Sequence, residues 1–163
     1  MSLNEPVLRE WDEEMKITRR VIERVPSEKG DWKPHAKSFS MAHLTQLTAT
    51  MPGWITRIMK GQDIDLGHSD PYKTQTTASL LEQFDKHVKE SRAAIAAAKD
   101  EDFAKPWSLK MGDRVLLTLP RGVILRQTIN HLVHHRGQMT VYLRLLDVPV
   151  PSVYGPTADE RMF

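Results

Sequence analysis

Apolar residues recur at intervals of three and four along four stretches of the chain, which is the spacing of amphipathic helices. The first stretch covers residues 6–25, and its apolar positions are Val7, Leu8, Trp11, Met15, Ile17, Val21 and Ile22. The second begins near residues 38–40 and ends at Gly61, the third covers residues 76–98, and the last covers residues 121–146. The pattern therefore predicts four long helices.

Residues that commonly cap helices stand at three of the predicted helix starts. Asn4 precedes the first apolar stretch, Ser38 and Ser40 precede the second, and Ser79 and Glu82 have capping-box spacing in the third. Their side-chain oxygens can accept hydrogen bonds from backbone N–H groups that the first helical turn leaves unpaired. These positions support the predicted starts.

Prolines, glycines and polar residues mark the breaks between the helices. Residues 26–37 are expected to form a connection in which Trp32 folds back onto the helices. Residues 107–119 suit a short hairpin or an irregular excursion before the last helix, and residues 147–163 form a proline-rich tail. Pro52 lies inside the second pattern and is expected to kink or divide that helix.

Length and composition favour one all-α domain over residues 1–163, built as a four-helix bundle with short or moderate connections. The chain has 163 residues, of which 40% are hydrophobic and 27% charged, a mixture typical of soluble globular proteins. It has no strand-rich half and no internal repeat. The domain is long enough to bury a sizeable core.

Charge and cysteine content narrow the possible functions. The 23 lysines and arginines against 21 acidic residues leave a net charge of +2, and the basic residues are scattered, so we expect no nucleic-acid partner. No run approaches the roughly 18 apolar residues of a spanning helix, and the N-terminus is polar; we expect no membrane association and a cytoplasmic location. The absence of cysteine leaves histidine and carboxylate chemistry.

Three of the seven histidines fall within residues 131–135. On a helix, His131 and His135 lie one turn apart on one face, whereas His134 is rotated about 100° from His135. Neutral imidazole binds zinc, nickel or iron, so two ligands of a divalent-metal site can come from this helix. The alternative is a pair of partly buried histidines satisfied by carbonyl groups or water. No Glu follows His131, so the metalloprotease motif is absent.

A third ligand has to come from another helix, and His43 is the leading candidate. It shares nearly one stripe of the second helix with Leu47 and Met51, which would direct it inward. The alternative is a histidine at the end of the core that binds no ion. The remaining histidines lie in connections or on a polar helix face and are expected at the surface: His35, His68 and His87.

Several segments resemble those of the DinB/YfiT-like proteins. The C-terminal signature of that family is similar to HLVHHRGQM at residues 131–139, YLR at residues 142–144 and VPVPSVYGP at residues 148–156. The segments WKPHAKS at residues 32–38 and MPGW at residues 51–54 also resemble the family, so the similarity spans residues 32–160.

The resemblance implies an up-down-down-up four-helix bundle, commonly a homodimer, in which three histidines hold a divalent metal, zinc or nickel above all. Members with known activity use low-molecular-weight thiols: they include thiol S-transferases and the mycothiol-dependent maleylpyruvate isomerase, in which the metal would stabilise a thiolate. Many relatives have no assigned reaction. A DNA-binding role, which only the damage-inducible name of the family suggests, is disfavoured by the charge.

Residue by residue, His131 and His135 fall on the two C-terminal ligand positions of the family. The first ligand usually stands seven residues before the tryptophan of the Pro-x-Trp element, and Leu47 occupies that position here. His43 is one helical turn earlier, about 6 Å along the axis. We take His43 as the third ligand, with Gln46 as the alternative.

The sequence thus yields two functional hypotheses. In the first, the chain is a metal-binding protein, such as a thiol-dependent S-transferase or another metal-assisted enzyme acting on a small molecule, in which Gln138 and Tyr142 contact substrate or cofactor. Arg136 is expected to pair with a carboxylate or a dimer partner. In the second, the chain is a non-enzymatic dimeric bundle with a degenerate two-histidine site that binds a small ligand or a partner.

Overall fold

The computed structural model describes residues 2–68 and 71–161. Its four long helices are α1 (Asn4–Ile22), α2 (Met41–Lys60), α3 (Thr77–Ala97) and α5 (Arg121–Leu145). The shorter elements are η1 (Ser27–Lys29), β1 (Ile64–Asp65), η2 (Leu66–His68), α4 (Asp100–Ala104), β2 (Pro106–Met111) and β3 (Arg114–Pro120). The fold is therefore mostly helical but not all-α, because it includes a small sheet.

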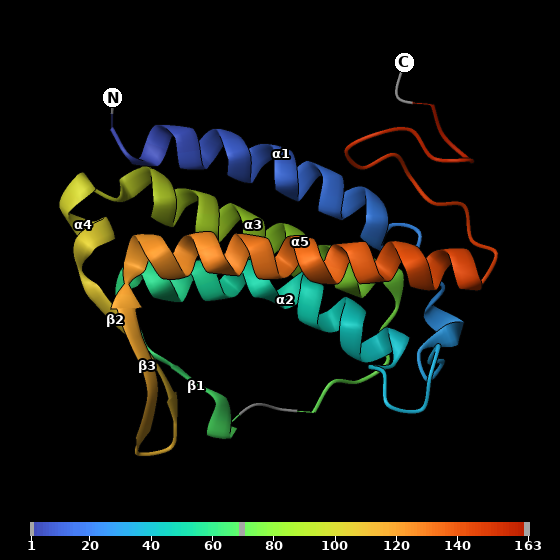
Figure 1. Ribbon diagram of the computed structural model, residues 1–163, viewed down its shortest axis with the longest axis horizontal. Helices are drawn as coiled ribbons and strands as arrows, with labels where there is room; N and C mark the ends of the chain where they lie inside the picture. The colour runs from blue at the N-terminus through green and yellow to red at the C-terminus, as the bar shows by residue number, and fades with distance from the viewer. Residues whose placement is uncertain (1, 69–70, 162–163) are drawn as a thin grey trace.

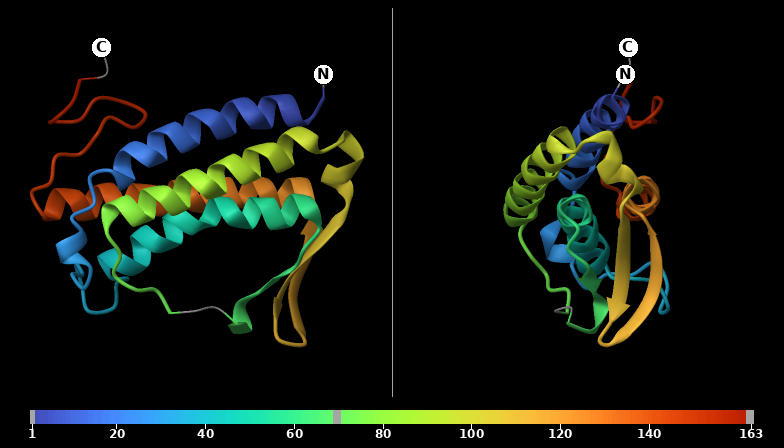
Figure 2. Two further views of the ribbon diagram at one scale, coloured as in Figure 1. Left: turned by 180° about the vertical axis from the view of Figure 1, so that it is seen from behind. Right: turned by 90° about the vertical axis from the view of Figure 1, so that its left-hand side faces the viewer.

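The four long helices lie side by side (Figure 1). In that view α1 and α5 run from left to right, whereas α2 and α3 run from right to left, and Figure 2 shows the same arrangement from two other directions. α2 packs against α3 and α5, and α1 packs against the same two helices. The candidate site residues on α2 and α5 therefore belong to neighbouring helices.

The core consists of the apolar faces that the sequence pattern predicts. Large side chains that are fully buried come from every long helix: Trp11 and Ile22 of α1, Leu44, Met51, Ile55 and Ile58 of α2, Leu80, Phe84 and Ile95 of α3, and Leu125 of α5. Each such side chain contributes about 1.5–3 kcal/mol by leaving water. The helix positions are thus fixed mainly by this shared core rather than by helix propensity.

Cap geometry settles which residues start the helices. The Ser40 hydroxyl accepts a hydrogen bond from the His43 N–H at 3.2 Å, so Ser40 caps α2. The predicted start of α3 near residues 76–79 is confirmed, but the cap is Thr76, whose hydroxyl accepts from the Ser79 N–H at 3.2 Å, and not Ser79. Asn4 does not cap α1 either: it lies inside the helix, and its side-chain amide donates to the Ala96 carbonyl.

A three-stranded mixed sheet stands at one end of the helices. β2 and β3 form the antiparallel hairpin that the sequence predicted, and β1 adds to β2 in parallel, with Ile64 opposite Leu109. Trp107 is buried and its Nε1–H donates to the Gln62 carbonyl at 2.8 Å, which ties the hairpin to the segment after α2. In Figure 1 the hairpin projects from the end of the molecule where α5 begins.

Two further expectations concern α2 and its entrance. Pro52 lies inside α2, which continues through it without division. Trp32 folds back as expected: its ring contacts Tyr142 edge-on, with ring centres 5.4 Å apart. Within the described ranges, none of the helices has the combination of length and apolar character needed to cross a membrane.

Candidate metal centre

His131 and His135 meet on α5. Their Nε2 atoms are 2.8 Å apart and their ring centres 4.5 Å apart, as their one-turn separation on a helix requires. His135 is only 5% exposed, whereas His131 lies at the surface beside it. The structure thus brings together the two residues that the sequence proposed as ligands from one helix.

A hydrogen bond from His135 to Gln138 defines the tautomer of His135. The Gln138 Oε1 atom lies 2.8 Å from the Nδ1 of His135, and because an amide oxygen only accepts, Nδ1 carries the proton. The Nε2 of neutral His135 is therefore an acceptor, and His131 donates its Nε2–H across the 2.8 Å contact. Gln138 thus orients His135 toward its neighbour, and the contact with substrate or cofactor that we expected of it stays a prediction.

The surroundings of the pair favour neutral rings. Burial lowers the pKa of the His131 imidazole, and the nearby His135 and His134 lower it further. Burial also lowers the pKa of His135; the Gln138 hydrogen bond raises it and His134 lowers it. Both rings are therefore neutral at pH 7, the state in which an imidazole nitrogen can bind a metal ion.

His43 lies near the start of α2 but is not part of this pair. Its ring stacks on Phe39, with centres 4.0 Å apart and planes 10° apart, and contacts the Tyr72 ring at 4.1 Å. Burial lowers the pKa of His43, and so do His135 and Lys33. Among the described residues, no three His, Asp or Glu side chains are grouped so that they could hold one ion.

The two other α2 positions considered as ligands are engaged elsewhere. Leu47, at the family's ligand position, is 6% exposed and belongs to the core. The Oε1 of Gln46 accepts a hydrogen bond from the Lys73 N–H at 2.8 Å and so holds the backbone at Lys73, ahead of α3. Neither side chain contributes to the α5 pair.

Tyr142 supports the site from one side. The buried Tyr142 hydroxyl donates to the Phe39 carbonyl at 3.1 Å, and Phe39 in turn stacks on His43 and lies 6.2 Å from the His135 ring. Tyr142 thus holds the segment that carries Phe39. The structure gives this residue, which we expected to contact substrate or cofactor, a positioning contact.

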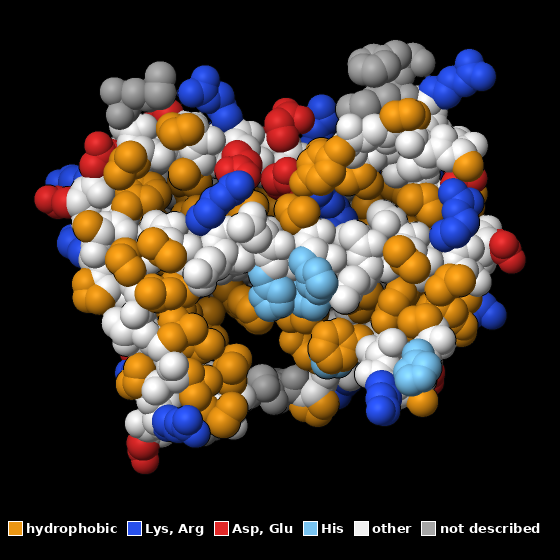
Figure 3. Space-filling model, viewed as in Figure 1, with side chains coloured by type: hydrophobic (Ala, Val, Ile, Leu, Met, Phe, Trp, Pro, Cys, Tyr) orange, Lys and Arg blue, Asp and Glu red, His pale blue; other side chains and the backbone are white. Residues whose placement is uncertain are grey.

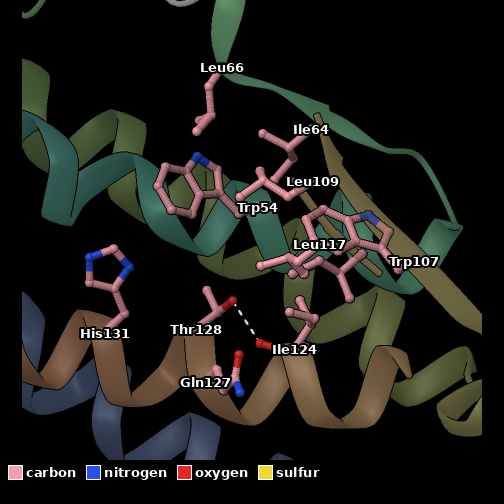
Figure 4. A pocket seen from close by; sticks show the side chains of 11 residues that line it. Trp54, Ile64, Leu66, Trp107, Leu109, Leu117, Ile124, Gln127, Thr128 and His131 are labelled. Carbon is pink, nitrogen blue, oxygen red and sulfur yellow. Dashed lines mark hydrogen bonds between the residues drawn. The ribbon is translucent and has the colours of Figure 1, made fainter. Parts of the chain in front are cut away.

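A cavity of about 260 Å³ opens beside the histidine pair. We call it the hairpin cavity, because the sheet forms one wall and α2 and α5 form the others; its lining includes Trp54, Ile64, Trp107, Leu117, Ile124 and His131 (Figure 4). In Figure 3 histidine side chains gather above a hollow whose walls are largely hydrophobic. Sequence reasoning missed this cavity, because only the folded hairpin brings Trp107 opposite Trp54.

The remaining histidines are separate from the pair. His35 is exposed, as predicted. His87, which we expected at the surface, is half-buried: it packs against Gly53 of α2, and burial lowers its pKa. The side chain of His68 lies outside the described residues. His134 is exposed on α5, with its ring centre 5.1 Å from that of His135.

Arg136 is turned away from the pair into the core. It is 1% exposed, and its guanidinium donates to Glu14 at 2.6 Å, to Thr18 at 3.1 Å and to the Tyr154 hydroxyl at 2.6 Å. Of the two partners we expected for Arg136, the structure shows the carboxylate. The contact joins α1, α5 and the C-terminal segment behind the site.

Fold and site together define a mostly helical protein with a histidine pair between α2 and α5. The model of the DinB family matches residues 1–161, and the chain belongs to that family.

Relatives and solved structures agree with this assignment. The chain is 26% identical over 160 residues to the uncharacterized protein YrdA of Bacillus subtilis, an overlap of 94% of this chain and 89% of YrdA. A DinB-like crystal structure from Bacillus cereus superposes with a TM-score of 0.74 at 21% identity, covering 94% and 98% of the two chains. The DinB-like protein YjoA of Bacillus subtilis gives 0.69 at 16% identity, covering 96% and 100%.

Proposed function

We propose that this chain is a divalent-metal-binding protein, with His131 and His135 as ligands in an up-down-down-up four-helix bundle. The observation that carries the proposal is the 2.8 Å separation of the two Nε2 atoms. Nitrogens about 2.1 Å from one ion lie about 3.0 Å apart at octahedral angles and about 3.4 Å apart at tetrahedral ones. A slight movement of the two rings away from each other would bring the nitrogens to either spacing.

The donor chemistry fits zinc or nickel. Both rings are neutral at pH 7 because burial lowers their pKa values, and the lone pair of His135 Nε2 already points toward His131. His131 presents its own lone pair once its proton moves to Nδ1. The Gln138 Oε1 then keeps His135 in the ligand tautomer, as outer-shell partners of metal-binding histidines commonly do.

His43 is the proposed third ligand. It has to leave its stack between Phe39 and Tyr72 to do so, and aromatic pairs of this kind are worth only about 0.5–1.5 kcal/mol beyond burial. When bound, a divalent ion supplies a Lewis acid that lowers the pKa of a thiol or water. This chemistry suits a thiol-dependent S-transferase or another metal-assisted enzyme that acts on a small molecule in the cytoplasm.

A homodimer is part of the same proposal. Val141 and Leu145 lie one turn apart on α5 and are each 56% exposed, so they offer an apolar strip for a second copy. If this strip pairs two chains, sedimentation should show a dimer for the parent chain and a monomer for Leu145→Lys. Arg144→Lys, next to the strip, serves as the charge-preserving control.

A non-enzymatic protein with a two-histidine site is the second candidate. It is favoured by one observation: Leu47 stands buried at the family's ligand position while His43 is stacked between two aromatic rings. In that case the pair on α5 would bind an ion weakly or not at all, and the chain would act by binding a small ligand or a partner.

Metal titration separates the two candidates. Protein stripped with a chelator is titrated with zinc or nickel, and one ion per chain is expected. Mutation of an outer-shell partner typically weakens metal binding about 10–100-fold. His131→Ala and His135→Ala each remove a ligand and should therefore weaken binding by more than that. His134→Ala, an exposed neighbour on α5, should bind as the parent does.

The variant His43→Ala tests whether two or three histidines bind the ion. Loss of affinity in this variant supports a three-histidine site. Full metal occupancy in His43→Ala together with its loss in His131→Ala means that only two histidines act. No binding by the parent chain refutes the proposed function and leaves the second candidate.

A further inference from the structure

We propose that the hairpin cavity binds the substrate, a neutral molecule with a flat aromatic or similarly apolar body whose polar end faces His131. The inference rests on the proposed function, because it takes the histidine pair as the reactive end of the site. It adds a substrate class and a binding surface that the metal ligands alone do not define.

The lining of the hairpin cavity selects an apolar body. Trp54 of α2 and Trp107 of β2 contribute indole rings, and Ile64, Leu117 and Ile124 contribute aliphatic side chains. Among the residues that the structure describes, none that lines the cavity is an aspartate, glutamate, lysine or arginine. A charged ligand would therefore lose its hydration without gaining an ionic partner.

The volume of the cavity limits the size of the ligand. At about 260 Å³ it exceeds the roughly 150 Å³ apolar cavity that accepts benzene. It falls below the usual range for drug-sized ligands, which begins at about 300 Å³. One fused bicyclic ring, or a single ring with a short chain, matches this space.

The polar groups around the cavity place the polar end of the ligand. The Thr128 hydroxyl donates to the Ile124 carbonyl at 2.8 Å, and the Trp107 Nε1–H donates to the Gln62 carbonyl at 2.8 Å, so these two donors are already used. The other polar side chains of the lining, Gln127 and His131, both lie on α5. The imidazole of His131 stands at the opposite end from Trp107 (Figure 4). The centre of the Trp54 ring is 6.1 Å from that of the imidazole, so the two rings line the same end of the cavity.

Two probes that share one ring system test the chemistry of the cavity. The metal-free chain is titrated calorimetrically with 2-naphthol, which is neutral, and with 2-naphthalenesulfonate, which is anionic. Burial in an uncharged cavity predicts that 2-naphthol binds at least about tenfold more tightly. Because the chain carries a net charge of +2, surface adsorption favours the sulfonate instead. Equal or tighter sulfonate binding overturns the inference.

Matched variants on β3 test the location. Leu117 lines the cavity and its neighbour Leu116 does not. Leu117→Trp should weaken 2-naphthol binding at least about tenfold by filling the space, whereas Leu116→Trp should change it less than about twofold. If Leu117→Trp does not fold, Leu117→Phe is measured instead. Unchanged affinity in the folded Leu117 variant refutes the location.

A third comparison tests the orientation of the ligand in the cavity. It also distinguishes failure of the cavity inference from failure of the proposed metal-binding function. His131→Ala should weaken 2-naphthol about fivefold, by loss of one hydrogen bond, and leave 2-methylnaphthalene unchanged. An equal loss for both probes refutes the polar end at His131. Metal uptake without preference for 2-naphthol refutes the cavity inference alone. Preference for 2-naphthol without metal uptake refutes the proposed function alone.

Discussion

At the residue scale, the tautomer of His135 depends on a single acceptor. Gln138 Oε1 lies 2.8 Å from His135 Nδ1 and fixes the proton there. Gln138→Leu removes the acceptor, so zinc affinity should fall about 10–100-fold, whereas Gln138→Glu should retain it. Competition with a chelating dye measures the affinity, and ¹⁵N chemical shifts of the metal-free rings report the tautomer. Unchanged shifts in Gln138→Leu would show that the tautomer has another cause.

Residue spacing predicted only part of this site. His131 and His135 were found because helical periodicity places residues four apart on one face, whatever the remainder of the fold does. The position of His43 depends on Phe39 and Tyr72, which reach it from outside α2. Contacts of that kind follow from tertiary packing, which local spacing does not determine. The role of Gln138 was missed for the same reason, since a substrate contact and a histidine contact look alike in sequence.

At the scale of single elements, the start of α2 positions His43. Ser40 Oγ accepts the hydrogen bond from the His43 N–H, whereas Ser38 makes a different contact, donating its N–H to the His35 carbonyl at 2.9 Å. Ser40→Ala should therefore cost about 1 kcal/mol of unfolding free energy in urea titrations. Ser38→Ala is the matched control and should change it by less than about 0.5 kcal/mol. An equal loss in both variants would contradict the assignment of the cap.

The ion pair between Glu14 of α1 and Arg136 of α5 should contribute more to the unfolding free energy than the cap does. Glu14→Gln removes the charge that faces the Arg136 guanidinium, which is 1% exposed, and should cost about 3–5 kcal/mol of unfolding free energy. Asp12→Asn on the same helix breaks an exposed pair with Arg92 and should cost far less. Urea titrations of the two variants measure the difference. Similar losses would mean that Arg136 is held by Thr18 and Tyr154 rather than by charge.

Elements with a long periodic pattern were predictable, whereas the shortest elements, β1 and α4, were not. α5 ends within one residue of the predicted boundary, because its apolar spacing persists over many turns. β1 has only two residues and pairs with β2, so no local sequence pattern predicts it. α4 is a single short helix with acidic residues at its start. Its buried residue, Phe103, owes its burial to packing against the rest of the fold.

At the scale of the whole molecule, partly buried histidines should make the metal-free chain sensitive to mild acid. Burial lowers the pKa values of His43, His87, His131 and His135 below their ordinary value of 6.5. As the pH falls below that value, the unfolded chain binds protons that the folded chain does not, which favours unfolding. The stabilisation is complete above pH 6.5 and is lost through the window below it, down to the folded-state pKa values.

Urea titrations at about pH 7.5 and about pH 5.5 test this dependence. The unfolding free energy should be lower at the acid pH, and the double variant His131→Ala, His135→Ala should show a smaller difference between the two. His35→Ala, which removes an exposed imidazole, should behave as the parent chain does. The carboxylates of Asp159 and Glu160 do not contribute to the difference, because their pKa values lie below ordinary values of 3.8 and 4.5. Both groups therefore stay charged throughout the tested range, and a slope that is identical in the double variant would place the acid sensitivity in His43 and His87.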